Sequence, residues 1–158
     1  MAILSTSSLK LSTYTISAWV KRIGGTFPQE IVSKGSCGPT CNYKLVIDSD
    51  GTLYLDFYDT TWRVVGGSTI LSVNTWYYVV GTYDGIAMKV YLNSILDGTT
   101  NYAGTPNTDN TAVEIGRLNG AMGVRQFMGN IDDVRIYNRA LSGPEVLALY
   151  NRGLGCVP

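Results

Sequence analysis

Hydrophobic and polar side chains alternate along much of this chain, and a period of two is the pattern that places successive residues on opposite faces of a β-strand. In the segment 14–21, one face would carry Tyr14, Ile16, Ala18 and Val20 and the other Thr15, Ser17, Trp19 and Lys21. The first set predicts a strand with one face in a core. On the other face we expect Trp19 to pack beneath a covering loop, because large aromatic side chains mostly contribute packing area.

The segment 52–58 shows the clearest two-faced pattern. Leu53, Leu55 and Phe57 would share one face, and Tyr54, Asp56 and Tyr58 would share the opposite one. The apolar row predicts a second core strand. The polar and aromatic row has to face either solvent or a ligand.

Further short hydrophobic runs, separated by turn residues, predict the remaining strands. They are 30–35, 42–48, 62–65, 75–83, 87–92, 95–96, 112–117 and 131–139. Asp50-Gly51 and Asp84-Gly85 are strong hairpin signals. The segment 98–110 is rich in Thr, Asn, Gly and Pro, which indicates a long loop with at most one weak edge strand. Short strands with tight turns favour an all-β, antiparallel two-sheet sandwich over a parallel sheet.

A helix is predicted near the C-terminus, from about Ser142 to Asn151. Ser142 is a favourable N-cap, Glu145 three residues later completes a capping box, and Pro144 is tolerated in the first turn. The apolar stripe consists of Val146, Leu147, Leu149 and Tyr150, and Gly153 ends it. This is the only convincing helix signal in the sequence.

Three ordered stretches carry a family resemblance. Residues 129–142 read Gly-Asn-Ile-Asp-Asp-Val-Arg-Ile-Tyr-Asn-Arg-Ala-Leu-Ser, residues 14–21 read Tyr-Thr-Ile-Ser-Ala-Trp-Val-Lys, and residues 74–85 read Asn-Thr-Trp-Tyr-Tyr-Val-Val-Gly-Thr-Tyr-Asp-Gly before Val-Tyr-Leu-Asn at 90–93. These resemble the closing signature, first core strand and central hairpin of the laminin-G-like, concanavalin A-like jelly-roll family. The resemblance implies one jelly-roll domain over residues 1–158. Its expected core is Ile16, Ala18, Val20, Leu53, Leu55, Phe57, Val90, Leu92 and Ile136.

One departure from that family concerns the first strand. Its members usually open with a strand of the type Phe-Asp-Gly-x-x-Asp-Tyr, whereas only residues 1–11 precede the first core strand here. We therefore expect either a domain excised from or displayed by a larger protein, or another segment in place of that strand.

Size and charge narrow the possible functions. A chain of 158 residues suits one two-layer domain, and its 12 Lys and Arg balance its 12 Asp and Glu. Because the net charge is zero, the chain has no overall electrostatic attraction for nucleic acid, and nucleic acid is not an expected partner. No apolar run reaches the length of about 18 residues that a membrane span needs, so membrane insertion is not expected either. The N-terminus lacks the layout of a signal peptide, so an exported protein would carry its signal outside this sequence.

Cysteines stand at positions 37, 41 and 156. Gly38-Pro39-Thr40 is a turn-forming sequence, so a local disulfide between Cys37 and Cys41 is the preferred interpretation. Two free thiols, or a bond from Cys156 to one of them, are the alternatives. A zinc site is disfavoured because the chain has no histidine.

Catalysis has no convincing candidate residues. Laminarinase-type glucanases of this fold carry a Glu-x-Asp-x-Glu cluster on one strand, and no such cluster is present; Glu30, Glu114 and Glu145 are isolated in the sequence. The absence of histidine removes the usual base for a serine or cysteine nucleophile. We therefore expect a protein that is not an enzyme.

The family resemblance also implies a possible calcium site at Asp132 and Asp133, helped by Asn130, since members often hold calcium in a rim cage of carboxylate and carbonyl oxygens. The alternative is that one of these carboxylates braces the neighbouring backbone.

A sugar site needs a flat aromatic face flanked by planar polar groups. Tyr54, Asp56, Tyr58, Trp62 and Arg63 meet this need in residue type. The ordinary alternative is that outward tyrosines are simply good strand formers, half covered by loops.

Two functional hypotheses follow. The first is a noncatalytic, secreted or cell-surface module that binds an oligo- or polysaccharide. The second is a structural or adhesion domain of a surface protein or filament, with a protein partner.

Overall fold

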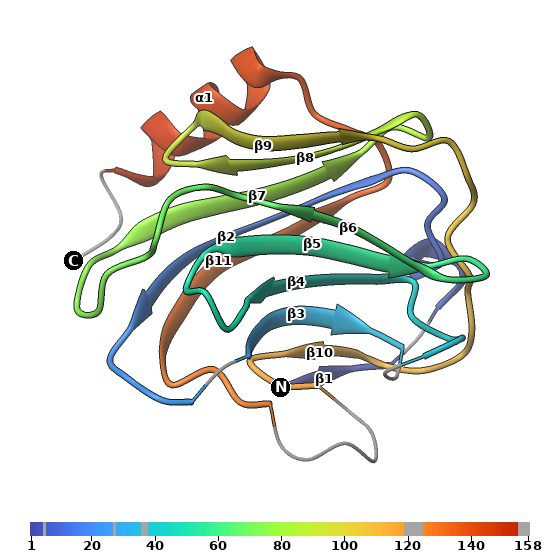
Figure 1. Ribbon diagram of the computed structural model, residues 1–158, viewed down its shortest axis with the longest axis horizontal. Coiled ribbons are helices and arrows are strands. Elements are labelled where there is room, and N and C mark those ends of the chain that lie inside the picture. The colour runs from blue at the N-terminus through green and yellow to red at the C-terminus, as the bar shows by residue number, and fades with distance from the viewer. Residues whose placement is uncertain (5, 27, 36–37, 119–124, 155–158) are drawn as a thin grey trace.

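The computed structural model describes residues 1–4, 6–26, 28–35, 38–118 and 125–154, and it shows two antiparallel sheets packed face to face (Figure 1). From edge to edge, the six-stranded sheet contains β1 (Ala2–Ile3), β10 (Val113–Ile115), β3 (Gln29–Lys34), β4 (Tyr43–Ile47), β5 (Leu53–Tyr58) and β6 (Trp62–Gly66). The five-stranded sheet contains β11 (Gly129–Tyr137), β2 (Tyr14–Arg22), β7 (Tyr77–Tyr83), β8 (Ala87–Leu92) and β9 (Ile95–Asn101). A short 3-10 turn, η1 (Ser7–Leu9), and one helix, α1 (Gly143–Gly153), complete the described elements. The predicted antiparallel jelly-roll sandwich with a C-terminal helix is confirmed.

The inner faces of both sheets form the main core. Eight of the nine predicted core residues are buried there: Ile16, Ala18, Val20, Leu53, Leu55, Phe57, Val90 and Leu92. Ile136 is only partly buried, although it packs against the same cluster. The difference arises because β11 is an edge strand of its sheet, and an edge strand is covered from one side only.

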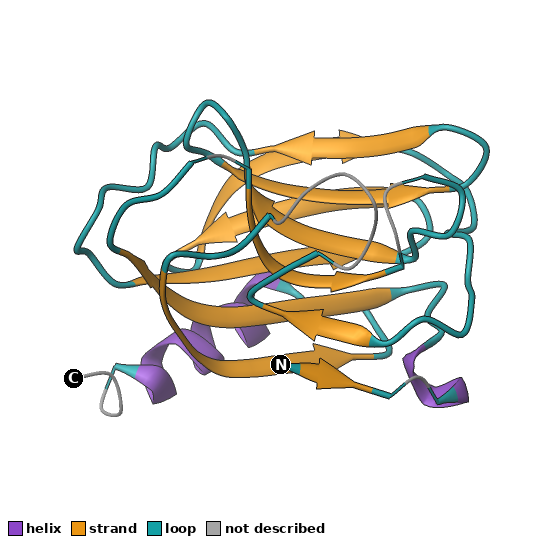
Figure 2. Ribbon diagram, turned by 90° about the horizontal axis from the view of Figure 1, so that it is seen from below, coloured by secondary structure: helices purple, strands orange, loops and turns teal. Residues whose placement is uncertain are grey.

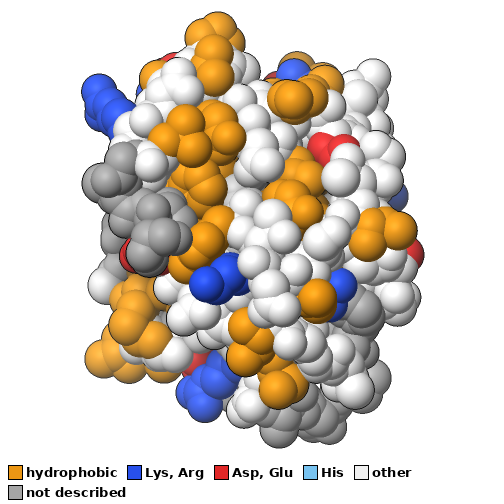
Figure 3. Space-filling model, turned by 90° about the vertical axis from the view of Figure 1, so that its left-hand side faces the viewer, with side chains coloured by type: hydrophobic (Ala, Val, Ile, Leu, Met, Phe, Trp, Pro, Cys, Tyr) orange, Lys and Arg blue, Asp and Glu red, His pale blue; other side chains and the backbone are white. Residues whose placement is uncertain are grey.

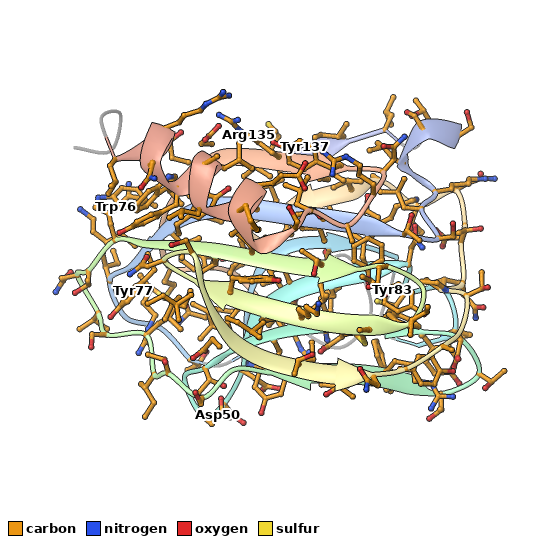
Figure 4. The ribbon with its side chains drawn as sticks, turned by 90° about the horizontal axis from the view of Figure 1, so that it is seen from above. Asp50, Trp76, Tyr77, Tyr83, Arg135 and Tyr137 are labelled. Atoms are coloured by element: carbon orange, nitrogen blue, oxygen red, sulfur yellow. The ribbon has the colours of Figure 1, made fainter. Side chains whose placement is uncertain are left out.

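A second apolar cluster lies on the outer side of the five-stranded sheet, beneath α1 (Figure 2). Trp19 is its centre: its ring stacks on Tyr150 of α1 with centroids 5.6 Å apart and packs against Tyr78 at 5.4 Å. Trp76 joins the same cluster near the C-terminal end of the helix (Figure 4). The prediction that Trp19 is covered was right, but the cover is the helix and not a loop.

The helix begins as its sequence predicts. The capping box is present, with the Ser142 N–H donating to Glu145 Oε2 at 2.8 Å. Arg139 donates two hydrogen bonds to the same carboxylate, so the connection between β11 and the helix also fixes the first helical turn. The last turn ends at Gly153, where a Cβ atom would lie 2.1 Å from Trp19 Nε1, so a side chain at this position would collide with the ring.

Two segments differ from the sequence prediction. β9 extends to Asn101, so residues 98–101 of the segment predicted as a loop with at most one weak edge strand belong to an edge strand, paired with β8 as far as Ala87 opposite Asn101. The ladder of hydrogen bonds outweighs the weak strand propensity of Gly98-Thr99-Thr100-Asn101. At the other end of the chain, the two residues of β1 pair with β10 and occupy an edge of the six-stranded sheet.

The two sides of the sandwich close differently. β6 and β9 approach so closely that a Cβ atom on Gly98 would lie 2.1 Å from the Gly66 carbonyl oxygen, and Asp97 accepts hydrogen bonds from Ser68 and Thr69 there. The side between β1 and β11 instead holds an open, mainly apolar groove of about 580 Å³. One side is therefore sealed and the other is not.

The loops at one end of the sandwich are joined by backbone hydrogen bonds: Asn74 donates to Arg22, and Ile23 donates to Met128. Seen from this end, hydrophobic side chains form separate patches among mostly uncharged surface (Figure 3). Small exposed hydrophobic patches are ordinary on the surface of a folded domain. No helix of the described chain combines the length and the apolar character that crossing a membrane would require.

The predicted turn before β4 is present, with the Cys41 N–H donating to the Gly38 carbonyl at 3.1 Å. Cys41 is buried, whereas Cys37 and Cys156 lie outside the described residues. The Cys37–Cys41 disulfide therefore stays a prediction. Protein made under oxidising conditions and alkylated without reductant should carry no label at these two positions by mass spectrometry; two labelled thiols would contradict the bond.

Candidate functional site

The outer face of the six-stranded sheet gathers aromatic and charged side chains. The alternation along β5 sends Leu55 and Phe57 into the core and turns Tyr54, Asp56 and Tyr58 outward. Strand pairing then fixes their neighbours: Lys44 of β4 lies opposite Asp56, and Trp62 of β6 lies opposite Tyr58. We call the surface made by Tyr54, Asp56, Tyr58, Trp62 and Lys44 the aromatic face.

An ion pair lies at the centre of the aromatic face. Lys44 Nζ is 2.7 Å from Asp56 Oδ2, and both side chains are only 8% exposed. The same ammonium lies 4.8 Å from the centroid of the Trp62 ring, while Tyr58 packs edge-on against Trp62 at 5.6 Å. Trp62 remains 37% exposed. The arrangement is an accessible indole held in place by a buried ion pair and a second aromatic ring.

A second charged pair adjoins the first. Glu30 of β3 has no exposed surface, and its Oε1 atom faces Arg125 Nη1 at 3.5 Å. Ser33, on the same strand, donates to the Arg117 carbonyl at 3.0 Å. The described parts of the segment between β10 and β11 thus lie against this part of the sheet.

Two carboxyl oxygens of this cluster, Glu30 Oε2 and Asp56 Oδ1, are buried and receive no hydrogen bond from the described residues. A buried acceptor that loses water and gains no donor is destabilising by about 1 to 3 kcal/mol. Most such atoms in folded proteins are satisfied by protein or by ordered water. Ordered water is the usual partner of such a buried oxygen.

Burial shifts the ionisation of these groups. It raises the pKa of Glu30 from 4.5 to about 7, because the attraction of Lys44 and Arg125 only partly offsets the loss of water. The pKa of Asp56 is raised for the same reason, despite Lys44. Burial by itself would lower the pKa of Lys44, but Asp56 and Glu30 outweigh it and the pKa is raised. The cluster thus keeps Lys44 charged while both carboxyl groups bind protons more readily than in water.

Of the five residues predicted for a sugar site, four lie together and one does not. Tyr54, Asp56, Tyr58 and Trp62 share the outer face. Arg63 follows Trp62 and therefore points to the other side of β6, where it pairs with Asp59 at 3.2 Å and stacks over Tyr102 at 3.8 Å. It lines an edge pocket of about 290 Å³ between β6 and β9, and Trp62 lines the same pocket.

Tyr54 is only partly available at the far end of the aromatic face. Its hydroxyl donates to Asp50 Oδ2 at 2.9 Å, and its ring lies over Gly66 of β6. Asp50 is in the turn between β4 and β5, at the periphery of the molecule (Figure 4). Tyr54 therefore contributes ring surface, while its hydroxyl is already bonded.

Sequence reasoning missed Glu30, Lys44 and Arg125. Glu30 was isolated in the sequence, and the three residues come from different strands or loops. The sequence signal for these residues was weak. It consisted of Lys44 occupying an outward-facing position of a predicted strand. Only the pairing of β4 with β5 places it beside Asp56.

A family model described as "Concanavalin A-like lectin/glucanases superfamily" (Laminin_G_3) matches residues 2–147. The chain belongs to this superfamily. No curated protein matches it in sequence. Among solved structures, the carbohydrate-binding module CBM40 of the Ruminococcus gnavus IT-sialidase superposes with a TM-score of 0.75 at 19% identity, covering 89% of this chain and 83% of that one.

Two further structures resemble this superfamily member. Domain 4 of AbnA, an extracellular GH43 arabinanase from Geobacillus stearothermophilus, has a TM-score of 0.71 at 24% identity, covering 90% of this chain and 68% of that one. The SAP-like pentraxin from Limulus polyphemus has a TM-score of 0.65 at 19% identity, and the match covers 94% of this chain and 80% of the pentraxin chain. At these identities the likeness shows the fold alone. The similar domains are mostly carbohydrate-binding rather than catalytic domains.

The acidic residues predicted for calcium in this concanavalin A-like chain lie on β11. A register shift between Asp132 and Arg135 interrupts the strand, and Asp133 has a positive φ of 47°. Asp133 Oδ1 accepts from Arg135 Nε at 2.8 Å, and Asp132 Oδ1 accepts from the Asp133 N–H at 2.7 Å. Arg135 lies beside α1 (Figure 4).

These contacts bear on the calcium prediction. A calcium cage needs about 6 to 8 oxygen ligands. Within the described residues no three acidic, cysteine or histidine side chains converge to hold a metal, and Asp133 is already paired with a guanidinium. The backbone-bracing role, weighed as the alternative, is what Asp132 performs here. Calcium binding by Asn130, Asp132 and Asp133 stays a prediction on which the proposed function does not depend.

Proposed function

We propose that this chain is a noncatalytic, extracellular carbohydrate-binding domain that holds its sugar on the aromatic face. The single observation that carries the proposal is the exposed Trp62 ring, fixed in place by Tyr58 and Lys44. A pyranose or furanose presents C–H groups to an aromatic ring and hydroxyl groups to polar neighbours. The aromatic face offers both within one surface.

The geometry also favours binding over hydrolysis. Glycoside hydrolysis needs two carboxyl groups placed across the bond, free to protonate it and to attack it or activate water. Asp56 is held by Lys44 at 2.7 Å, and Glu30 has no exposed surface and faces Arg125. Neither carboxyl group is free to approach a glycosidic bond in this arrangement.

Similar domains support the choice of a carbohydrate. The AbnA domain was solved in complex with arabinotriose, and the Ruminococcus gnavus module was solved bound to α2,3-sialyllactose. AbnA is an extracellular arabinanase, which supports an extracellular setting for the present chain.

Trp62→Ala is the direct test of the proposal. Removing a stacking platform should weaken binding several-fold, equivalent to about 1 kcal/mol, while the melting temperature changes little because the ring is 37% exposed. Glycan array screening, followed by calorimetric titration of the best oligosaccharide, gives the affinity. Thermal unfolding of the same samples gives the stability.

Ile95→Ala is the matched control, since Ile95 is 72% exposed on β9 of the other sheet and should leave both quantities unchanged. Unchanged affinity in a folded Trp62→Ala variant would remove the aromatic face as the site. If no glycan binds and the protein instead self-associates with concentration or captures a surface protein, the structural or adhesion hypothesis replaces the proposal.

A further inference from the structure

The edge pocket between β6 and β9 adjoins the aromatic face, because Trp62 belongs to both. The seam between these two strands is closed where Gly66 meets Gly98, and it opens into the pocket further along, toward Trp62 and Asn101. The pocket has a volume of about 290 Å³. Small-molecule pockets measure about 300 to 1,000 Å³, so this one suits a single small group such as one sugar ring.

The Trp62 ring connects the two surfaces. Strand order places Lys44 of β4 on one side of β6, and the edge pocket lies on the other side, toward β9. The Lys44 ammonium lies over the ring, 4.8 Å from its centroid, so part of the ring is covered from the β4 side. The residue is nevertheless 37% exposed and lines the pocket. A sugar stacked on the remaining ring surface therefore lies beside the pocket, and a residue linked to that sugar can enter it.

Arg63 is held in a fixed orientation on the β6 side of the pocket. Its Nε group donates to both carboxylate oxygens of Asp59 at 3.2 Å, and its guanidinium lies over the Tyr102 ring at 3.8 Å. The Tyr102 hydroxyl donates to the same carboxylate. Both hydrogen bonds to Asp59 leave from Nε, whereas the Nη groups carry most of the guanidinium donors. Because the Arg63 side chain is 29% exposed, its Nη groups can donate to ligand hydroxyls.

The β9 side of the pocket adds two short polar side chains. Thr100 and Asn101 are both exposed at the end of this edge strand, and they bring a hydroxyl and an amide, which can each donate and accept hydrogen bonds. Met88 of β8 supplies a buried apolar part of the lining. Polar groups on two strands combined with apolar and aromatic surface are the lining that a sugar ring needs.

We infer that the edge pocket is a second sugar subsite, and that the ligand is a linear oligosaccharide rather than a single sugar. One residue of the ligand stacks on Trp62, and its neighbour enters the pocket between Arg63 on β6 and Thr100 on β9. The inference rests on the proposed function and specifies the length of its ligand. The second residue adds contacts without a further loss of translational and rotational freedom, so affinity grows with chain length.

The experiment compares one glycan at several lengths. A glycan array identifies the oligosaccharide that binds most tightly, and calorimetric titration compares it with its own shorter fragments down to the monosaccharide. The oligosaccharide should bind about tenfold or more tightly than the monosaccharide. The same titrations are then repeated with variants of the pocket.

Thr100→Phe fills the pocket and should bring the affinity for the oligosaccharide down to about that of the monosaccharide. Thr99→Phe is the matched control: Thr99 is exposed on the same strand, and adjacent strand residues point to opposite sides, so this variant should bind like the wild type. Asn101→Ala is a milder change that removes one polar group and should weaken oligosaccharide binding about threefold or more. Thermal unfolding shows that each variant is folded.

The outcomes separate this inference from the proposed function. Affinity that does not change with chain length, or full oligosaccharide affinity in a folded Thr100→Phe variant, would overturn the inference. If Thr100→Phe does not fold, full affinity in Asn101→Ala has the same meaning. Loss of binding in Trp62→Ala would in each of these cases leave the proposed function intact. Binding of no glycan, or binding unaffected by Trp62→Ala, would overturn both.

Discussion

Trp19→Ala should lower the free energy of unfolding by about 3 to 5 kcal/mol, the range for truncating a buried aromatic side chain. Trp19 is 4% exposed and joins β2 to α1 by stacking on Tyr150, so its removal opens a cavity beneath the helix. For a domain of this size the loss corresponds to a melting temperature lower by about 10 °C. Thermal and urea unfolding, followed by circular dichroism, measure it.

Trp62→Ala is the natural comparison, because it deletes the same side chain where it is exposed. Trp19→Phe provides a milder variant: it keeps an aromatic ring and removes the Trp19 Nε1 group, which is buried and has no hydrogen-bond acceptor among the described residues. We expect wild type, Trp62→Ala and Trp19→Phe to have similar free energies of unfolding. We expect Trp19→Ala to be much less stable than all three. A Trp19→Ala variant that melts with the wild type would show that α1 does not depend on this contact.

Glu30→Gln should stabilise the domain above neutral pH. The pKa of Glu30 is raised from 4.5 to about 7 by burial, so the folded state binds this proton more tightly than the unfolded state does. Stability then falls as the pH rises from about 4.5 to about 7, and the loss is complete above the folded pKa. At about 1.4 kcal/mol for each unit of pKa, Glu30 would destabilise the wild type by about 3 kcal/mol at pH 8.

Urea unfolding at several pH values between 4.5 and 8 measures this effect as the difference between Glu30→Gln and wild type. Asp56 contributes to the wild-type slope in the same direction, so the comparison with the variant is needed to isolate Glu30. The difference should be near zero at pH 4.5 and largest at pH 8. A constant difference across the range would mean that Glu30 does not titrate between these values.

Glu145→Gln is a control of opposite sign. Hydrogen bonds from Arg139, and then from Ser142, lower the pKa of Glu145 to about 2. Its stabilising contribution is present above the unfolded pKa and is lost as the pH falls toward 2. The Glu145→Gln variant should therefore be less stable than wild type at neutral pH, which distinguishes a surface glutamate in a helix cap from a buried glutamate in the cluster.

Local patterns in the sequence determined most of the framework. Alternation along residues 14–21 and 52–58 identified which side chains enter the core, because the side-chain period of a strand is fixed by backbone geometry alone. The helix start at Ser142 followed from its capping box, which is also a local device. Residues whose environment depends on neighbours within a few positions were therefore placed correctly.

The tertiary structure alone decided what those faces meet. Trp19 was assigned to the correct face, but only the path of the chain after β11 places a helix over it. Gly98-Thr99-Thr100-Asn101 has weak strand propensity and becomes strand because β8 offers it a ladder. Asp133 leaves the regular alternation because the register shifts beside it, which no local pattern announces.

The residues of the candidate site also fall into those that local sequence pattern predicted and those that only the tertiary structure brought in. Tyr54, Asp56 and Tyr58 were predicted together because one strand carries them. Arg63 lies outside the aromatic face because adjacent strand residues point to opposite sides, although it lines an edge pocket together with Trp62. Glu30 and Lys44 entered the site through the pairing of β3 with β4 and of β4 with β5, and Arg125 entered it through a contact with Glu30, 95 positions away in the sequence. A sequence specifies each strand's faces locally, whereas the choice of neighbouring strand and its register depends on burial summed over the whole sandwich, and that choice creates the charged cluster.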